Sequence, residues 1–258
     1  MKIATWNVNS LRVRLPQVLD WLKTAQPDIL ALQETKTEDK NFPVAEIEAA
    51  GYNVIYSGQK TYNGVAILSR IAGSDIATDI PHLDDHQRRV LCATFGTVRV
   101  LNVYIPNGEA VGSEKYSYKL AWLEKLTAYV EAQRAVYPHL ILLGDFNIAP
   151  APDDVHDPAA WEGHVLFSEP ERAAFRRLID LGLCDTFRLF EQASGQFSWW
   201  DYRMAAFRRN MGLRIDHVLA SPALRDVCAS CHIDKTPRAW ERPSDHTPVV
   251  AVFNLPGK

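Results

Sequence analysis

Short apolar runs alternate along this chain with amphipathic stretches, and the alternation predicts an α/β fold. Runs rich in Val, Ile and Leu that are bounded by turn-forming residues predict buried strands, whereas apolar residues at helical spacing predict helices. The predicted strands cover residues 2–8, 29–32, 52–56, 65–68, 89–95, 98–104, 140–143, 214–219, 228–233 and 249–253. The predicted helices cover residues 15–22 (ending before residue 27), 114–137 and 169–181. Because hairpin-like pairs and helix-separated strands occur together, we expect two mixed β-sheets covered by helices.

Length and charge narrow the class of protein. The chain has 258 residues without a low-complexity linker, so we expect a single domain over residues 1–258. A net charge of −3 excludes attraction of nucleic acid by the molecule's overall field, so DNA binding would need a local basic patch. The N-terminus has no apolar signal segment, and no apolar run approaches the roughly 18 residues of a membrane span. We therefore expect a cytoplasmic protein without a membrane partner.

Acidic and amide groups border several of the apolar runs, and they are the candidate chemistry. The segments are Gln33-Glu34-Thr35, Gly144-Asp145-Phe146-Asn147, Asp216-His217 and Pro243-Ser244-Asp245-His246. Carboxylates placed where strands break into loops can converge on one face of a sheet core. Several carboxylates with one His and no Cys partner suit a hard divalent cation and a phosphate ester. The pattern therefore indicates a metal-dependent phosphodiesterase that acts on nucleic acid.

The run Cys228-Ala229-Ser230-Cys231-His232 matches a haem-attachment spacing and half of a zinc site. Haem attachment of this kind needs export, for which the sequence has no signal, and the zinc site lacks a fourth ligand. Four cysteines do not form a disulfide scaffold in a chain of this size. We interpret the run as an ordinary strand that holds small, buried thiols.

Segments from the first predicted strand to the last carry a family resemblance. They are Thr5-Trp6-Asn7-Val8-Asn9, Leu32-Gln33-Glu34-Thr35-Lys36, Tyr62-Asn63-Gly64-Val65-Ala66, Asn102-Val103-Tyr104-Ile105-Pro106-Asn107-Gly108, Gly144-Asp145-Phe146-Asn147-Ile148-Ala149-Pro150, Arg214-Ile215-Asp216-His217 and Ser244-Asp245-His246-Thr247-Pro248. Each is weak alone, but in this order they resemble the exonuclease III family of the endonuclease/exonuclease/phosphatase superfold. The resemblance implies a four-layer α/β sandwich, with two mixed β-sheets packed face to face and flanked by helices. It also implies Mg²⁺- or Mn²⁺-dependent cleavage of DNA phosphodiesters at abasic sites and 3′ ends.

The metal is expected at Glu34, with Asn7 and Asp245 as second ligands or as groups that orient the metal's waters. A carboxylate directly after an apolar strand is well placed to hold Mg²⁺. By the resemblance, His246 lies beside Asp216, whose carboxylate fixes the orientation of the imidazole. His246 can then hydrogen-bond or protonate an oxygen of the scissile phosphate.

Asp145, Asn147 and Tyr104 complete the expected catalytic set. Asp145 is the candidate for activating the attacking water or for protonating the leaving oxygen, and the sequence leaves both roles open. Asn147 lies two positions further on, so strand alternation lets it face the same cleft. Asn147 and Tyr104 are candidate hydrogen-bond donors to the phosphate. His217 should point to the other side of its strand from Asp216, so we expect it to serve packing or the surface.

Contacts to DNA are expected from scattered groups, because basic side chains neutralise phosphates and aromatic side chains stack or wedge. The expected substrate contacts are Arg12, Lys60, Tyr62, Asn63 and Lys115. The wider set contains Arg14, Tyr116, Lys119, Arg203, Arg208, Arg209 and Arg214.

A pocket for a displaced abasic sugar is implied by the resemblance. Trp199, Leu213 and Ile215 would line it, and Arg203 would intrude into the duplex. Leu213 and Arg203 stand where eukaryotic members carry Trp and Met, whereas bacterial exonuclease III types show the same Leu and Arg. The sequence therefore favours a bacterial-type enzyme and leaves open the balance between abasic-site cleavage and 3′-end trimming. Residues 161–167 border the expected groove.

We expect a DNA repair nuclease that uses in-line attack by water. Its partner would be double-stranded DNA with abasic sites, nicks, or recessed or blocked 3′ ends, and it would work as a monomer in the bacterial cytoplasm, at the nucleoid. The alternative is a phosphatase or phosphodiesterase for inositol or lipid phosphates, which the same acids would serve; the Trp199-Trp200 loop and the distributed basic residues disfavour it. A binding module without chemistry is disfavoured because every expected catalytic position is filled.

Overall fold

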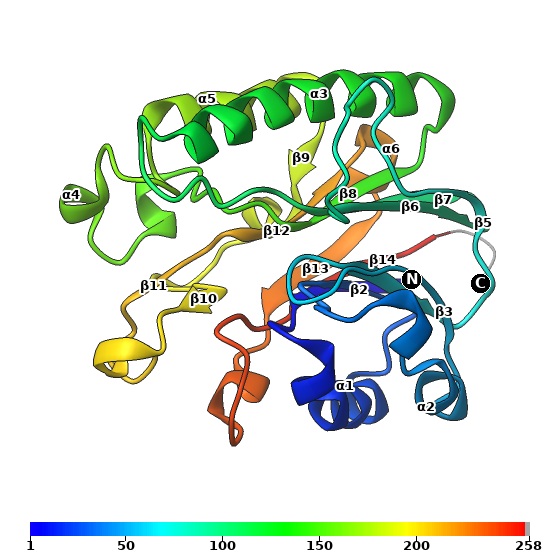
Figure 1. The fold of residues 1–258 in the computed structure, drawn as a ribbon. Coiled ribbons are helices and arrows are strands. Elements are labelled where there is room, and N and C mark those ends of the chain that lie inside the picture. The colour runs from blue at the N-terminus through cyan, green and yellow to red at the C-terminus, as the bar shows by residue number, and fades with distance from the viewer. Residues whose placement is uncertain (256–258) are drawn as a thin grey trace.

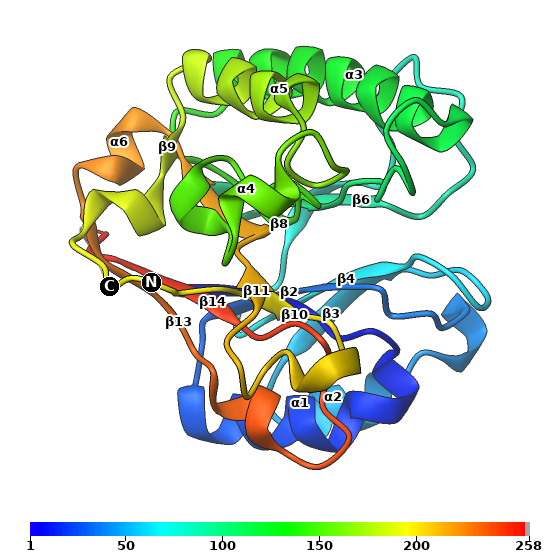
Figure 2. The same cartoon turned by 90° about the vertical axis from the view of Figure 1, so that its left-hand side faces the viewer.

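The computed structural model describes residues 1–255, and these residues form four layers, helix–sheet–sheet–helix (Figure 1). The helices α1 (Leu11–Ala25) and α2 (Val44–Ala49) cover the outer face of one sheet. The helices α3 (Glu114–Val136) and α5 (Glu169–Asp180) cover the outer face of the other. Figure 2 shows the same order of layers from the side. The predicted four-layer α/β sandwich is therefore confirmed.

The first sheet has six strands in the order β13-β14-β1-β2-β4-β3. Their bounds are β1 Lys2–Asn7, β2 Ile29–Gln33, β3 Asn53–Ser57, β4 Val65–Ser69, β13 Cys228–Ile233 and β14 Val249–Phe253. β1 pairs parallel with β2 and antiparallel with β14, so the sheet is mixed. The first and the last strand of the chain are thus hydrogen-bonded neighbours.

The second sheet also has six strands, in the order β5-β6-β7-β8-β12-β9. Their bounds are β5 Ser74–Ala77, β6 Val90–Phe95, β7 Val98–Tyr104, β8 Leu140–Asp145, β9 Cys184–Asp185 and β12 Asp216–Ala220. β7 and β8 are parallel, so Tyr104 and Asp145 end side by side. β12 runs antiparallel to β8, and the register places Asp216 opposite Asp145.

Strand side chains alternate between two apolar layers, and this explains the nearly continuous hydrophobic runs. In β1, Ile3 packs into the core between the sheets, whereas Ala4 and Trp6 pack into the core under α1. In β8, Ile141 faces the first sheet and Leu142 faces α3 and α5. Burial of each Ile or Leu among them stabilises the fold by about 1.5–3 kcal/mol relative to exposure, so both faces of each sheet must be apolar and covered.

A polar bridge crosses the apolar core at the end of the sheets where the candidate chemistry lies. The Gln33 amide donates to Asn102 Oδ1 (2.7 Å) and to Thr5 Oγ1 (2.9 Å). The Asn102 amide in turn donates to the carbonyls of Leu32 and Ala66, at 3.0 and 2.9 Å. These hydrogen bonds between buried amides connect the two sheets and fix their relative position.

Several elements were not predicted from the sequence. They are α2, β5, β9, the ribbon of β10 (Trp199–Trp200) and β11 (Gly212–Leu213), α4 (Pro158–Trp161), α6 (Pro222–Arg225) and 3-10 helices at Asp39–Asn41, Pro152–Asp154, Thr186–Leu189, Arg203–Ala205 and Thr236–Ala239. Helix α1 begins at Leu11, earlier than the apolar spacing indicates. The elements that were not predicted have two to six residues each, which is too short for periodicity to reveal them. No helix in residues 1–255 is long and apolar enough to cross a membrane.

Candidate active site

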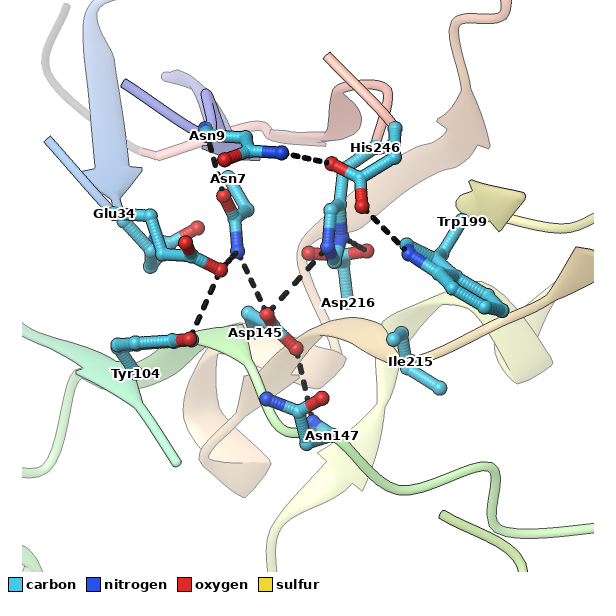
Figure 3. Close-up of polar contacts among 12 residues, drawn as sticks. Asn7, Asn9, Glu34, Tyr104, Asp145, Asn147, Trp199, Ile215, Asp216 and His246 are labelled. Carbon is cyan, nitrogen blue, oxygen red and sulfur yellow. Dashed lines mark hydrogen bonds and ion pairs between the residues drawn. The ribbon is translucent and has the colours of Figure 1, made fainter. Parts of the chain in front are cut away.

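The ends of strands from both sheets deliver the candidate residues to one place. Asn7 ends β1, and Glu34 directly follows β2 in the first sheet. Asp145 ends β8 in the second sheet, and Asp216 begins β12 opposite it. Because parallel strands share one carboxyl edge and β12 enters at the same edge, these side chains converge (Figure 3).

Asn7 connects the two sheets at this edge. Its Nδ2 donates to Glu34 Oε1 (2.9 Å) and to Asp145 Oδ2 (2.8 Å), while its Oδ1 accepts from the backbone N–H of Asn9 (2.9 Å). Glu34 itself adopts a left-handed backbone with φ of 51°. The turn after β2 is held by backbone bonds from Thr35 and Lys36 to the 63–64 segment. In this arrangement Asn7 bridges the two carboxylates.

His246 lies between two carboxylates. Its Nδ1 is 2.8 Å from Asp216 Oδ2, and its Nε2 is 3.7 Å from Asp145 Oδ2. The turn that carries it is fixed to β1, because the Ser244 hydroxyl donates to the Asn7 carbonyl at 2.7 Å. All of these groups are buried, and Figure 3 shows Asp145 and Asp216 beside His246. The residues Glu34, Asp216 and His246 therefore share one site, linked through Asn7 and Asp145.

The electrostatics of this site follow from burial and from charge neighbours. Burial raises the pKa of Asp145 to about 7, and the neighbouring Asp216 carboxylate adds to the increase against the opposing effect of His246. Burial lowers the pKa of His246, but the carboxylates of Asp216 and Asp145 outweigh it and raise the pKa to about 10. Burial raises the pKa of Glu34, but the Lys36 ammonium and the Asn7 amide outweigh it and hold the pKa below its usual value.

Tyr104 and Asn147 border the same group. The Tyr104 hydroxyl donates to Glu34 Oε1 at 2.9 Å, and burial together with the negative charge of Glu34 raises the Tyr104 pKa well above its ordinary value. Tyr104 is therefore a protonated donor. Asn147 lies beyond the end of β8 in a left-handed conformation with φ of 50°, so a turn, not strand alternation, aims it at the site. Its backbone N–H donates to Asp145 Oδ1 at 2.9 Å.

The donor set fits a hard divalent cation. Among the described residues, one group has metal-ligand spacing, with one atom each of Asp145, Asp216 and His246 within 4.8 Å of one another. In that part of the chain Asp216 Oδ1 is buried without a hydrogen-bond partner, and Glu34 brings a further carboxylate through Asn7. Clustered buried carboxylates repel one another unless positive charge lies among them, and oxygen ligands suit Mg²⁺ or Mn²⁺.

Asp245 lies at one remove from this cluster. Its Oδ1 accepts from Asn9 Nδ2 (3.0 Å) and its Oδ2 accepts from Trp199 Nε1 (3.0 Å). Asn9 Oδ1 accepts in turn from Lys36 Nζ at 2.6 Å, and Lys36 pairs with Glu34 Oε2 at 2.9 Å. Asp245 is therefore connected to Glu34 only indirectly, by hydrogen bonds through Asn9 and Lys36. From this position it can orient the site.

Three residues of this site were missed as functional candidates from the sequence. Asn9 and Lys36 stand inside the family motifs, two positions after Asn7 and Glu34, and that spacing was a usable signal. Ser198 gave no signal: it is buried, and its hydroxyl accepts the backbone N–H groups of Ile215 and Asp216, both at 3.1 Å. Ser198 thereby fixes where β12 begins.

The residues predicted to form the sugar pocket do come together. Leu213 pairs with Trp199 across the β10–β11 ribbon, and Leu213 and Ile215 are fully buried in an apolar cluster that Trp199 partly covers. Only Trp199 of the three is accessible as the structure stands. Arg203 lies apart on an exposed 3-10 helix, where it forms an ion pair with Asp201 at 2.6 Å.

Two clefts border the candidate site, one at Glu34 itself and one at its ion-pair partner Lys36. A cleft of about 770 Å³ is lined by Glu34 and Tyr104 together with Tyr62, Asn63 and Lys115. A second cleft of about 620 Å³ is lined by residues that include Arg12, Lys36 and Lys60. The predicted substrate contacts in these loops therefore border the site.

Lys119 and Arg214 correct the predicted set of DNA contacts. Both side chains are buried and cannot reach a duplex: Lys119 pairs with Glu171, and Arg214 bonds to Asp154 and Asp185. Apolar surroundings tolerate such charges only when they are paired.

His217, the neighbour of Asp216, packs inside the molecule. Its Nδ1 lies 3.1 Å from Arg214 Nη1, and its Nε2 lies 2.9 Å from the Ile148 carbonyl. Its ring contacts Phe146 and Phe175. Burial, and the positive charge of Arg214, lower its pKa to about 4. It points away from the site, as strand alternation requires.

The chain belongs to the endonuclease/exonuclease/phosphatase family, which matches residues 4–246. It is 38% identical over 266 residues to exodeoxyribonuclease III of Haemophilus influenzae, covering 98% of this chain and 100% of that protein. Its structure is similar to the 3′ phosphatase NExo from Neisseria bound to a product DNA hairpin (TM-score 0.97, 49% identity, covering 99% of this chain and 100% of that one). It is also similar to an AP endonuclease from Archaeoglobus fulgidus (TM-score 0.95, 40% identity, covering 99% and 100%).

Proposed function

We propose that this protein is a metal-dependent DNA repair nuclease that hydrolyses phosphodiesters at abasic sites and phosphate esters at 3′ ends. The observation that carries the proposal is the hydrogen-bonded series Glu34–Asn7–Asp145, joined by His246 to Asp216, which draws on both sheets. Its relatives support the choice of DNA as substrate, because their names describe an exodeoxyribonuclease, a 3′ phosphatase and an AP endonuclease.

Mg²⁺ or Mn²⁺ is the proposed cofactor, held by Glu34 with the neighbouring carboxylates and with Asn7 and Asp245 orienting the site. When bound, the ion would stabilise negative charge on the phosphate oxygens. The lowered pKa of Glu34 supports this assignment, since an ionised carboxylate is the better ligand.

Asp145 is the proposed general acid or base. A pKa of about 7 suits either activation of the attacking water or protonation of the leaving oxygen, because proton transfer is most effective near the working pH. His246 is proposed to donate a hydrogen bond to the phosphate, and Asp216 to hold its imidazole in place. Asn147 and Tyr104 are proposed as further phosphate donors, which for Tyr104 requires its hydroxyl to turn away from Glu34.

The DNA is proposed to lie across the two flanking clefts, in contact with Arg12, Lys60, Tyr62, Asn63 and Lys115. The basic side chains would neutralise phosphates. Trp199, Leu213, Ile215 and Arg203 are proposed to decide between an abasic sugar and an ordinary 3′ end.

We further propose that residues 1–258 act as one domain and as a monomer in the bacterial cytoplasm. Pairing of β14 with β1 supports a single domain, because it places strands from the two ends of the described chain side by side in one sheet. Inositol or lipid phosphates are not favoured as substrates, since the relatives named above are nucleases and DNA phosphatases.

The test compares cleavage of three duplexes, which carry an abasic analogue, a recessed 3′ end or a 3′ phosphate, with Mg²⁺ and with excess EDTA. We expect EDTA to abolish cleavage. We expect Asp145→Asn to lower kcat by about 100- to 10,000-fold, as removal of a general acid or base does. Asp20→Asn, on the exposed face of α1, is the matched control and should retain wild-type rates.

Failure of the wild-type protein to process all three duplexes with Mg²⁺ or Mn²⁺ would refute the proposal. Faster turnover of soluble inositol phosphates than of all three duplexes would favour the alternative substrate class. Full activity of Glu34→Gln would refute the assignment of the metal to Glu34.

A further inference from the structure

A buried ion pair lies behind the catalytic group. Lys119 of α3 and Glu171 of α5 are both 0% exposed, and their charged atoms form a short contact. Taking two charges out of water is expensive, and an apolar pair would hold two helices together as well. Helix packing alone does not explain this pair, whose polar contacts extend to loops outside the two helices.

The Lys119 ammonium uses each of its three hydrogens. One goes to Glu171 Oε1, one to the Asn147 carbonyl at 2.7 Å, and one to the Asn107 carbonyl at 3.1 Å. Asn107 follows β7, the strand of Tyr104, and Asn147 follows β8, the strand of Asp145. Lys119 thus ties together the two loops that leave the catalytic edge of the second sheet.

Glu171 holds the ammonium from the other side. Its Oε1 also accepts from the Leu166 N–H, and its Oε2 accepts from the Ser168 N–H, each at 3.0 Å. The hydroxyl of Ser168, the residue at the N-cap position of α5, donates to the same Oε2. Every acceptor position of Glu171 is engaged, so the place of the Lys119 ammonium is set by α5 and its cap.

The turn at Asn147 is the element that this pair can control. Asn147 has φ of 50°, a left-handed conformation that Asn adopts more readily than most residues other than Gly, and its contacts hold it there. In that conformation its N–H donates to Asp145 Oδ1 (2.9 Å), and its amide donates to the Ile105 carbonyl (2.9 Å). The amide oxygen accepts from Asn107 Nδ2 at 3.2 Å. Releasing the Asn147 carbonyl would let both the Asn147 side chain and the Asp145 carboxylate turn.

We propose that Lys119, held by Glu171, is a positioning residue for the reaction: it fixes the turn after β8 and so aims Asp145 and Asn147. The inference rests on the proposed nuclease function for its kinetic test. The geometry also gives it a test that needs no activity.

The test compares Lys119→Met, which keeps the length of the stem and loses the donors, with Lys119→Arg, which keeps donors and charge. Arg99→Met is the matched control. Arg99 is a buried cation at the other end of β7, and its guanidinium bonds to Gln133 of the same helix α3 at 2.8 Å. All proteins are assayed on the abasic duplex with Mg²⁺, well below their unfolding temperatures.

We expect Lys119→Met to lower kcat by about 10- to 100-fold with KM little changed, since a small misplacement of catalytic groups has effects of this order. Lys119→Arg should recover part of the loss, and Arg99→Met should lose stability but keep kcat within about twofold. If Lys119→Met is not folded, the double variant Lys119→Met/Glu171→Gln takes its place. It removes both charges and keeps a carbonyl to accept the Leu166 N–H.

Hydrogen exchange of the backbone N–H of Asn147, followed by NMR, is the readout that does not depend on catalysis. It should accelerate at least about tenfold in Lys119→Met, while the amide of Leu142 in the middle of β8 stays protected. Wild-type kcat and unchanged Asn147 exchange in a folded Lys119 variant would overturn the inference, as would an equal loss of kcat in Arg99→Met. An inactive wild type would count against the proposed function, and amide exchange would still decide the positioning role.

Discussion

Replacing Asp216 by Asn tests the electrostatic arrangement at the centre of the site. Asp216 Oδ2 lies 2.8 Å from His246 Nδ1, and both side chains are buried. Asn keeps the size of the side chain and removes its charge. In the metal-free protein the wild-type imidazole should carry a proton at pH 7.5, because its pKa is raised to about 10.

The expected effect can be worked from this distance. With an effective dielectric constant of about 20, a charge pair at 2.8 Å gains about 6 kcal/mol, which corresponds to a pKa change of about four. The pKa of His246 in Asp216→Asn should therefore fall to about 6. At pH 7.5 the imidazole is then neutral, and it has lost the positive charge that would strengthen its hydrogen bond to a phosphate. We expect kcat on the abasic duplex to fall by about 100- to 10,000-fold.

The assay is an NMR titration of the histidine ring protons in EDTA, from pH 5 to 10.5, for wild type and variant. His217 is the internal control. It is buried, and its ring contacts Arg214 and the Ile148 carbonyl, not the Asp216 side chain. Its signal should therefore stay constant with pH across this range in both proteins. A His246 pKa below 7.5 in the wild type, or the same pKa in both proteins, would refute the reasoning. Loss of activity without a change in pKa would show that Asp216 acts through another route.

Three further predictions concern the stability and activity of variants at His217, at Arg214, and at Leu213 and Arg203. The folded-state pKa of His217 is about 4, below the unfolded value of about 6.5, so only the unfolded chain gains a proton as the pH falls between these values. His217 should contribute a loss of about 3 kcal/mol of unfolding free energy across that window, so the pH dependence of stability in urea melts should differ between wild type and His217→Gln by about this amount; parallel curves would contradict this. Arg214→Met leaves Asp185 buried without its ion-pair partner and Asp154 with Arg188 alone, and should cost about 3–5 kcal/mol, whereas its DNA affinity, measured on folded protein by anisotropy, should match wild type. Leu213→Ala should cost about 2–5 kcal/mol because Leu213 is fully buried, whereas Arg203→Ala should change stability by less than about 0.5 kcal/mol. A selective loss of abasic cleavage relative to 3′-end trimming is expected for both, and equal loss on the two substrates would refute their assignment to the sugar pocket.

The residue pattern by itself indicated two mixed sheets covered by helices, and it singled out the candidate acids; the four-layer order came from the family resemblance. Apolar runs such as 29–32 and 140–143 have to be buried on both faces, which requires strands covered by another sheet and by helices. Glu34 and Asp145 were found because each stands where such a run ends, and the ordered motifs joined them to Asp216 and His246. Local residue patterns carry this information because burial and strand alternation are local properties of the chain.

Only the tertiary structure decided which charged side chains are buried in ion pairs and which remain accessible. Lys119 and Arg214 belong to the same basic set in the sequence as Arg12, yet the fold buries the first two in ion pairs. The fold also makes Asn7 a bridge between the sheets, because its partners are Glu34, directly after β2, and Asp145, at the end of β8. Burial and pairing are set by residues far away along the chain, so composition and spacing cannot distinguish a cation that meets DNA from one that fixes a turn.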